Sequence, residues 1–215
     1  MKPLILIVMD GWGVREEKEG NAIALAKTPN FDKFQKEGSY TELLTHGRYV
    51  GLAERMMGGS EVGHLNMGAG RIVKQDVVRI NEMIEDGSFF QNKSILKAFK
   101  NVKEKKSTLH LMGLLSDAGV HSHNSHLYAL LKLAQQQNIK KVKIHVFSDG
   151  RDTAPKDLKK YIKELKEKIK EYGVGEIATI IGRYFVMDRD NRWNRTQKAY
   201  RALVKGQGKE FHKAI

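Results

Sequence analysis

Short apolar runs alternate with segments of helical periodicity from Ser107 onward. The apolar runs are "TLHLMGLL", "KVKIHVFS" and "EIATIIG", and they precede "NSHLYALLKLAQQQ", "KDLKKYIKELKEKIKEYG" and "NRWNRTQKAYRALVKG", respectively. The short runs predict buried strands, and the spacing of apolar residues in the longer segments predicts helices. Alternation of this kind is typical of a parallel sheet covered by helices. The sequence therefore predicts an α/β fold with three layers and mainly parallel sheets.

The N-terminal part of the chain follows a different pattern. The apolar run "LILIVM" predicts a buried strand that leads into a glycine-bearing loop. Thr28 and Pro29 predict the start of a helix, and Gly38 predicts its end. The segment "SYTELLTHG" alternates apolar and polar residues, which predicts a second strand.

This change of pattern predicts a boundary between Val73 and Asp76, with one domain at 1–74 and another at 75–215. No run approaches the roughly eighteen apolar residues of a membrane-spanning helix, and the opening run is too short for a signal peptide. The sequence contains no cysteine, which excludes disulfides and thiolate zinc sites. A cytoplasmic location agrees with this composition.

The formal net charge of +13 suggests nucleic acid as a first partner to consider. Much of the excess lies in the lysine-rich segment "KDLKKYIKELKEKIKEYG", where Lys and Glu surround an apolar stripe as on a solvated helix. The basic runs also lack the interleaved aromatic residues of single-strand binders. We therefore expect a small anionic substrate held by a few arginines, and neither nucleic acid nor a membrane as partner.

Polar residues follow each predicted strand, at the edge where parallel sheets collect ligands. Asp10 follows the first apolar run, and the later runs lead into "SDAGVHSH", "SDGRD" and "GRYFVMDRDNRW". The guanidinium groups of Arg151, Arg183 and Arg189 match the shape of a phosphate or carboxylate. Ion pairing at the surface is the alternative for these arginines. The acids available for it are Asp152, Asp188 and Asp190.

The stretch "HSHNSH" contains His121, His123 and His126. The first two would share a face only on an extended backbone, and the third lies in a predicted helix, so zinc binding has little support. We expect His121 to contact an anionic ligand or to serve a structural role.

The stretch "GGSEVGHLNMGAGR" at 58–71 places Ser60 ahead of helix-compatible residues. As a helix cap, this serine would accept a hydrogen bond from an N–H of the first turn. As a nucleophile, it would lie where the amides of a helix N-terminus attract phosphoryl oxygens. The residues alone leave both roles open.

Five motifs together resemble the N-terminal half of cofactor-independent phosphoglycerate mutase, in the alkaline phosphatase superfamily. They are "MDGWG", "GGSEVGHLNMGAGR", "GLLSDAGVHSH", "FSDGRDTAP" and "GRYFVMDRDNRW". The resemblance implies interconversion of 3-phosphoglycerate and 2-phosphoglycerate through a phosphoserine intermediate. It also implies a phosphatase-like domain with two divalent metal ions, usually Mn²⁺, and an inserted transferase domain that holds the glycerate.

The same resemblance implies a role for individual residues. Asp10 would bind metal, and Ser60 would be both a metal ligand and the nucleophile, since a cation stabilises the alkoxide. An arginine pocket would retain the glycerate while the phosphoryl group changes position. The residues expected to contact substrate are His121, Arg151, Asp152, Arg183 and Arg189.

The chain departs from the family pattern in two ways. Before the serine, "GLAERMMGGS" has Ala53, Arg55, Met56 and Gly59 where the family has proline, glycine, glutamine and asparagine, which predicts altered phosphate contacts. Family members are also more than twice as long, and no Asp-rich and His-rich ligand set follows Arg189. The weak candidates there are Glu210 and His212.

We therefore expect a fragment, a split-gene product or a degraded copy that is inactive alone, with a second chain as the source of the missing half. Its partial sheet should leave unpaired edges and exposed apolar surface. Two alternatives stay open: a metal-dependent phosphohydrolase of the same superfamily, and a basic binding fragment without enzymatic activity.

Overall fold

The computed structural model describes residues 3–54 and 56–210. The chain separates into two compact units, unit 1 at Met1–Gln75 and unit 2 at Asp76–Ile215. The assignment of 1–74 and 75–215 to a phosphatase-like and a transferase domain stays a prediction. Arg55 and His212, which the sequence singled out, lie outside the described residues.

Unit 2 contains a three-stranded parallel sheet in the order β1-β2-β3. Its strands are β1 (Leu109–Leu115), β2 (Val142–Ser148) and β3 (Glu176–Gly182). The three apolar runs therefore form strands as predicted, and the α/β fold with parallel pairing is confirmed. No described strand pairs with the outer edge of β1.

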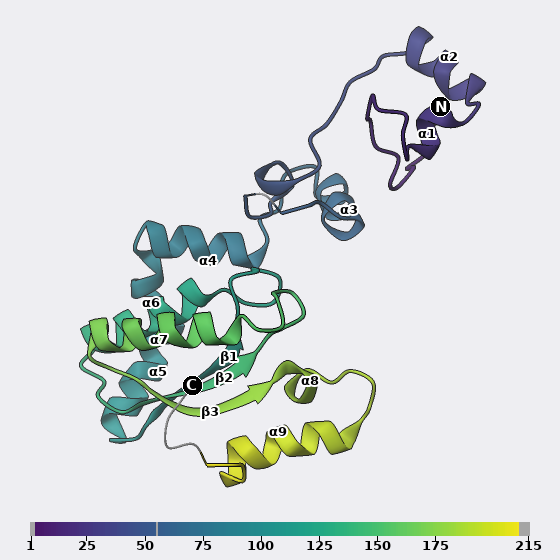
Figure 1. Cartoon of the computed structure of the whole chain (residues 1–215). Coiled ribbons are helices and arrows are strands. Elements are labelled where there is room, and N and C mark those ends of the chain that lie inside the picture. The colour runs from purple at the N-terminus through teal and green to yellow at the C-terminus, as the bar shows by residue number, and fades with distance from the viewer. Residues whose placement is uncertain (1–2, 55, 211–215) are drawn as a thin grey trace. The chain divides into compact units, whose positions relative to one another are not determined.

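Helices precede, connect and follow these strands (Figure 1). Those before the sheet are α4 (Asp76–Glu85), the short 3-10 helix η2 (Ser88–Gln91) and α5 (Lys93–Glu104). Those that connect or follow the strands are α6 (Asn124–Gln136), α7 (Leu158–Tyr172), α8 (Arg183–Val186) and α9 (Trp193–Lys205).

The core of unit 2 lies between the sheet and the contacting pair α6 and α7. Leu131 and Leu165 are 0% exposed, and Ile144 of the central strand is 1% exposed. On β1, side chains such as Met112 that point to the opposite face of the sheet are more exposed, and Met112 is 62% exposed. Burial of apolar side chains on one face thus holds this unit together, because each contributes about 1.5 to 3 kcal/mol.

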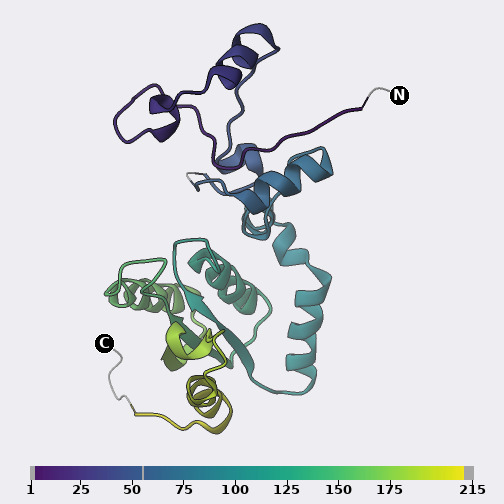
Figure 2. The ribbon, with the colours of Figure 1, turned by 90° about the vertical axis from the view of Figure 1, so that its right-hand side faces the viewer.

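Unit 1 is made of helices and loops, and Figures 1 and 2 show no strand in its described residues. Its elements are α1 (Ala22–Leu25), α2 (Pro29–Glu37), the 3-10 helix η1 (Gly47–Val50) and α3 (Ser60–Ala69). The helix predicted after Thr28 is confirmed, with Gly38 as its C-cap.

The two strands predicted for unit 1 are wrong. Residues 4–9 and 39–47 form no strand, and Leu4 and Leu6 are 94% and 80% exposed. A strand needs a neighbour that accepts and donates a series of backbone hydrogen bonds. In the described residues, the segment at 39–47 forms no such series, although the N–H of Gly47 donates to the carbonyl oxygen of Met56. Exposed apolar surface, which the sequence predicted, is therefore concentrated in unit 1. In the described part of the chain, no helix is long and apolar enough to span a membrane.

We expect hydrogen exchange to separate the two units. Amides of residues 4–9 should exchange within seconds, whereas those of β2 should be protected, because only β2 has partners on both sides. Mass spectrometry of peptides after exchange measures this. As a control, Leu165→Ala should weaken β2 protection through a loss of about 2–5 kcal/mol and leave residues 4–9 unchanged. Slow exchange at residues 4–9 would contradict the structure.

Candidate functional site

Three polar residues follow the strands of unit 2 at neighbouring positions. The last residues of β1, β2 and β3 are paired across the sheet, and Ser116, Asp149 and Arg183 come next in each case. Parallel strands deliver their carboxyl ends to one edge, so residues far apart in sequence meet there.

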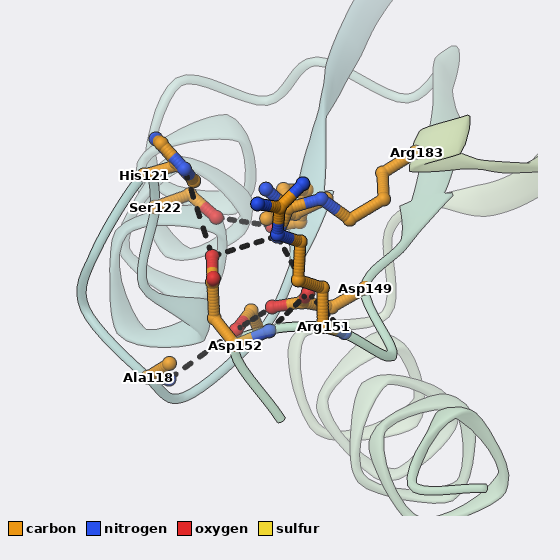
Figure 3. Close-up of polar contacts among 9 residues, drawn as sticks. Ala118, His121, Ser122, Asp149, Arg151, Asp152 and Arg183 are labelled. Atoms are coloured by element: carbon orange, nitrogen blue, oxygen red, sulfur yellow. Dashed lines mark hydrogen bonds and ion pairs between the residues drawn. The ribbon is translucent and has the colours of Figure 1, made fainter. Parts of the chain in front are cut away.

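Asp149 is the centre of the resulting hydrogen-bond network (Figure 3). The hydroxyl of Ser116 donates to Oδ2 at 2.7 Å. The backbone N–H groups of Arg151 and Asp152 donate to Oδ1 at 3.1 and 3.0 Å. Nη1 of Arg183 also donates to Oδ1, at 2.7 Å. With only 1% of its side chain exposed, this carboxylate joins the three strand ends through protein groups alone.

Two opposing effects set the pKa of Asp149. Burial raises it, because a charged carboxylate loses its hydration. Hydrogen bonds from Ser116, the N–H of Asp152 and Arg183 outweigh burial and lower the pKa to about 2. The group is therefore a carboxylate at every pH at which the protein is expected to work.

Arg183 is held by two carboxylates through a single nitrogen. Its Nη1 donates to Asp149 and, at 2.6 Å, to Oδ2 of Asp152. The hydrogen bonds that Arg183 donates to Asp152 and Asp149 raise its pKa, although burial opposes this. The pair with Asp152 was one alternative that the sequence left open. It is not a loose surface pair, since the Arg183 side chain is only 13% exposed.

The other expected substrate residues of unit 2 lie at the same strand ends or in the loop beyond β3. Figure 3 shows His121, Arg151, Asp152 and Arg183 gathered there. His121 is half exposed, with Nε2 at 3.6 Å from Oδ2 of Asp152. Arg151 and Arg189 are exposed, and no acceptor among the described residues binds either guanidinium group. These groups are free to bind an anion.

The loop that carries Arg189 is anchored by its neighbour Asp188. That carboxylate is 2% exposed and accepts from Nη1 of Arg195 at 3.3 Å and from the N–H of Arg192 at 2.8 Å. The guanidinium of Arg195 also lies 3.8 Å from the ring centre of Tyr184. The sequence considered Asp188 as a partner for the site arginines, whereas the structure pairs it with Arg195.

The remaining histidines of "HSHNSH" have separate partners. Nδ1 of His123 accepts from the N–H of Ser125 at 3.2 Å and caps α6. Nε2 of His126 lies 2.8 Å from Oδ1 of Asn81. The rings of His123 and His126 also contact each other, with centroids 6.0 Å apart, whereas His121 pairs with Asp152.

Ser60 is the first residue of α3, and Gly59 is its N-cap. The expected helix N-terminus is therefore present, but Ser60 is not the capping residue. Its Oγ lies 3.2 Å from Nδ1 of His64, which is also 2.8 Å from the carbonyl oxygen of Ser60. A carbonyl oxygen only accepts, so Nδ1 carries a proton and donates to it. In this tautomer, Nδ1 of His64 does not remove the proton of Ser60.

The proposed metal ligands do not complete a metal site in the described residues. Asp10 is exposed and its side chain forms no hydrogen bond or ion pair there. Within residues 3–54 and 56–210, no group of three or more His, Cys, Asp or Glu side chains could hold an ion. Asp10 and Ser60 offer two oxygen donors, too few for a divalent centre.

No role was predicted from the sequence for three residues that the structure places at the strand ends of unit 2 or beside Ser60. Asp149 and Ser116 lie inside quoted motifs, directly after predicted strands, and that position was the signal that could have identified them. His64 follows Ser60 by four residues, which places both on one face of a helix.

The low pKa of Asp149 predicts loss of stability in acid. Its folded-state pKa of about 2 is below the usual 3.8, so its contribution is complete above about pH 4 and is lost towards pH 2. The difference corresponds to about 2 kcal/mol. We expect Asp149→Asn to lack this part of the acid dependence in urea unfolding followed by circular dichroism. An unchanged dependence in the variant would contradict this.

Comparison with known proteins identifies the family to which this chain is similar. Residues 80–215 match the family model described as BPG-independent PGAM N-terminus. The chain is 54% identical over 214 residues to 2,3-bisphosphoglycerate-independent phosphoglycerate mutase of Lachnoclostridium phytofermentans. It is 52% identical over 214 residues to the enzyme of that name from Clostridium perfringens strain SM101. Each match covers 100% of this chain and 42% of the relative.

A solved structure supports the same relationship. Leishmania mexicana phosphoglycerate mutase, crystallised at low cobalt concentration, matches with a TM-score of 0.73 and 33% identity. The match covers 96% of this chain and 39% of that protein, so this chain spans about two fifths of the length of its relatives. The resemblance carried by the five motifs is confirmed. The chain belongs to the family of BPG-independent phosphoglycerate mutase N-terminal regions.

Proposed function

We propose that this chain provides the serine and most of the glycerate-binding residues of a phosphoglycerate mutase that interconverts 3-phosphoglycerate and 2-phosphoglycerate. The observation that carries the proposal is the pair of arginines at the carboxyl end of the sheet in unit 2. There, Arg183 is fixed by two carboxylates, while Arg151 has no acceptor among the described residues and His121 is half exposed. Such a group suits a small ligand with more than one negative charge.

In this proposal the two units have different tasks. The arginines of unit 2 hold the carboxylate of the substrate, so that glycerate stays bound while the phosphoryl group moves. Ser60 accepts the phosphoryl group at the start of α3, where amide N–H groups and the helix dipole favour phosphate oxygens. Retention of glycerate and exclusion of water are what separate a mutase from a phosphatase.

Divalent metal dependence is also part of the proposal, with two Mn²⁺ ions as the specific expectation. When bound, such ions stabilise the serine alkoxide. Asp10 and Ser60 supply oxygen donors of the right chemistry, but the described residues do not form a complete centre. We propose that the other ligands of such a centre come from residues beyond this sequence, on the same or a second chain. A cytoplasmic location is included and rests on the lack of cysteine.

We expect the chain to bind 3-phosphoglycerate through unit 2. Titration followed by NMR should shift signals of residues 116–121, 149–152 and 183–189. Arg151→Ala should raise the Kd about ten-fold or more, because a charge-assisted hydrogen bond is worth about 1.5–3 kcal/mol. Arg79→Ala, which removes an exposed arginine paired with Asp76 on α4, is the matched control. An equal effect of both variants would indicate nonspecific charge attraction and contradict the proposal.

Turnover by this 215-residue polypeptide should not exceed that of its Ser60→Ala variant. The reason is that its described residues bring no third ligand to Asp10 and Ser60. Formation of 2-phosphoglycerate from 3-phosphoglycerate with Mn²⁺, followed by ³¹P NMR, measures this. Turnover clearly above the control would refute the expectation. Release of inorganic phosphate above the control would instead favour a phosphohydrolase.

A further inference from the structure

The hydrogen bonds of Arg183 use only one end of its guanidinium group. Both carboxylates accept from Nη1, at 2.7 and 2.6 Å. Nε and Nη2 have no acceptor among the residues that the structure describes. These two nitrogens form the edge of the guanidinium that grips a carboxylate or phosphate with two parallel bonds. The protein thus holds the arginine at one end and leaves its other edge available.

The two carboxylates that hold Arg183 are not equivalent. Asp149 is 1% exposed and accepts from four donors. The side chain of Asp152 is 17% exposed, and among the described residues its carboxylate pairs with Arg183 and the more distant His121. Asp149 is therefore the fixed partner, and Asp152 is the one that an incoming ligand is able to displace or contact.

The backbone turn after β2 makes this role of Asp149 possible. Gly150 has a φ of +82°, and a Cβ atom there would lie 3.4 Å from the backbone of Pro155. This left-handed conformation turns the next two N–H groups back onto the Asp149 carboxylate. The same carboxylate consequently fixes the loop that bears Arg151 and Asp152 as well as the direction of Arg183.

We infer that Asp149 is a positioning residue of the substrate site, which holds Arg183 by Nη1 so that its Nε and Nη2 edge binds the anionic group of the ligand. Asp149 itself is too buried to touch the ligand and acts through Arg183 and the loop after β2. This inference rests on the proposed function for the nature of the ligand. The orientation of Arg183 by Asp149 does not depend on which ligand binds. An experiment on that orientation therefore tests the inference separately from the proposed function.

The variant Asp149→Asn tests the inference in the full 215-residue chain. Its amide oxygen still accepts from the two backbone N–H groups, but the charge that holds Arg183 is lost. Asp117→Asn is the matched control, because Asp117 lies in the neighbouring loop and is held by Tyr161 and Lys160 instead. Both variants are compared below their unfolding transitions, so that loss of fold does not contribute.

The first measurement needs no ligand. The NMR order parameter of the Arg183 Nε–H bond should fall in Asp149→Asn and stay at the wild-type value in Asp117→Asn. An unchanged order parameter in Asp149→Asn would overturn the inference. A wild-type chain that orders Arg183 in this way but binds no 3-phosphoglycerate would contradict the proposed function alone.

The second measurement is a double-mutant cycle on the Kd for 3-phosphoglycerate. Asp149→Asn should raise the Kd about ten-fold or more in the wild-type background, the effect of losing about 1.4 kcal/mol. In an Arg183→Ala background, the same substitution should change the Kd by less than about two-fold, because Asp149 acts through that arginine. Equal effects in both backgrounds would show a merely structural role and overturn the inference.

Discussion

The site of unit 2 depends on one buried negative charge. A carboxylate that is 1% exposed is stable only if protein groups replace its lost hydration, and Asp149 has four such donors. Those donors come from the segments that follow all three strands. The hydrogen bonds that stabilise the buried carboxylate therefore also bring the residues of the site together. Removal of Arg183 would leave this buried charge without its cation.

The sequence predicted the three strands of unit 2 and the long helices that follow them because these parts are specified locally, whereas it made no prediction for α4 and α5. A strand such as β2 and the helix that follows it are close in sequence, and the apolar stripe of α7 provides the surface that covers the sheet. The run at 4–9 has the same composition as a strand, yet it forms none. Its partners are not specified by neighbouring residues, so a local pattern could not decide whether hydrogen bonds would form.

The sequence predicted where the candidate site lies, but it did not predict which acidic side chain pairs with which arginine. Placing His121, Arg151 and Arg183 at strand ends required only the parallel order of the sheet, which brings those ends to one edge. Which acid meets which arginine depends on side-chain rotamers and burial, and the sequence offered several equivalent choices. Asp188 pairs with Arg195, and Arg183 binds Asp149 in addition to the Asp152 that the sequence had named.

In the proposed function, anion recognition and phosphoryl transfer make separable demands on the chain. The residues proposed to hold glycerate lie in unit 2, where the sheet, its apolar core and the ion pairs of Arg183 support the strand ends. Ser60 has a helix N-terminus and a histidine that donates rather than accepts, and Asp10 has no described partner. A hydroxyl without a base or a cation is a weak nucleophile near neutral pH, so under the proposed function the transfer step depends on ligands that the described residues do not supply.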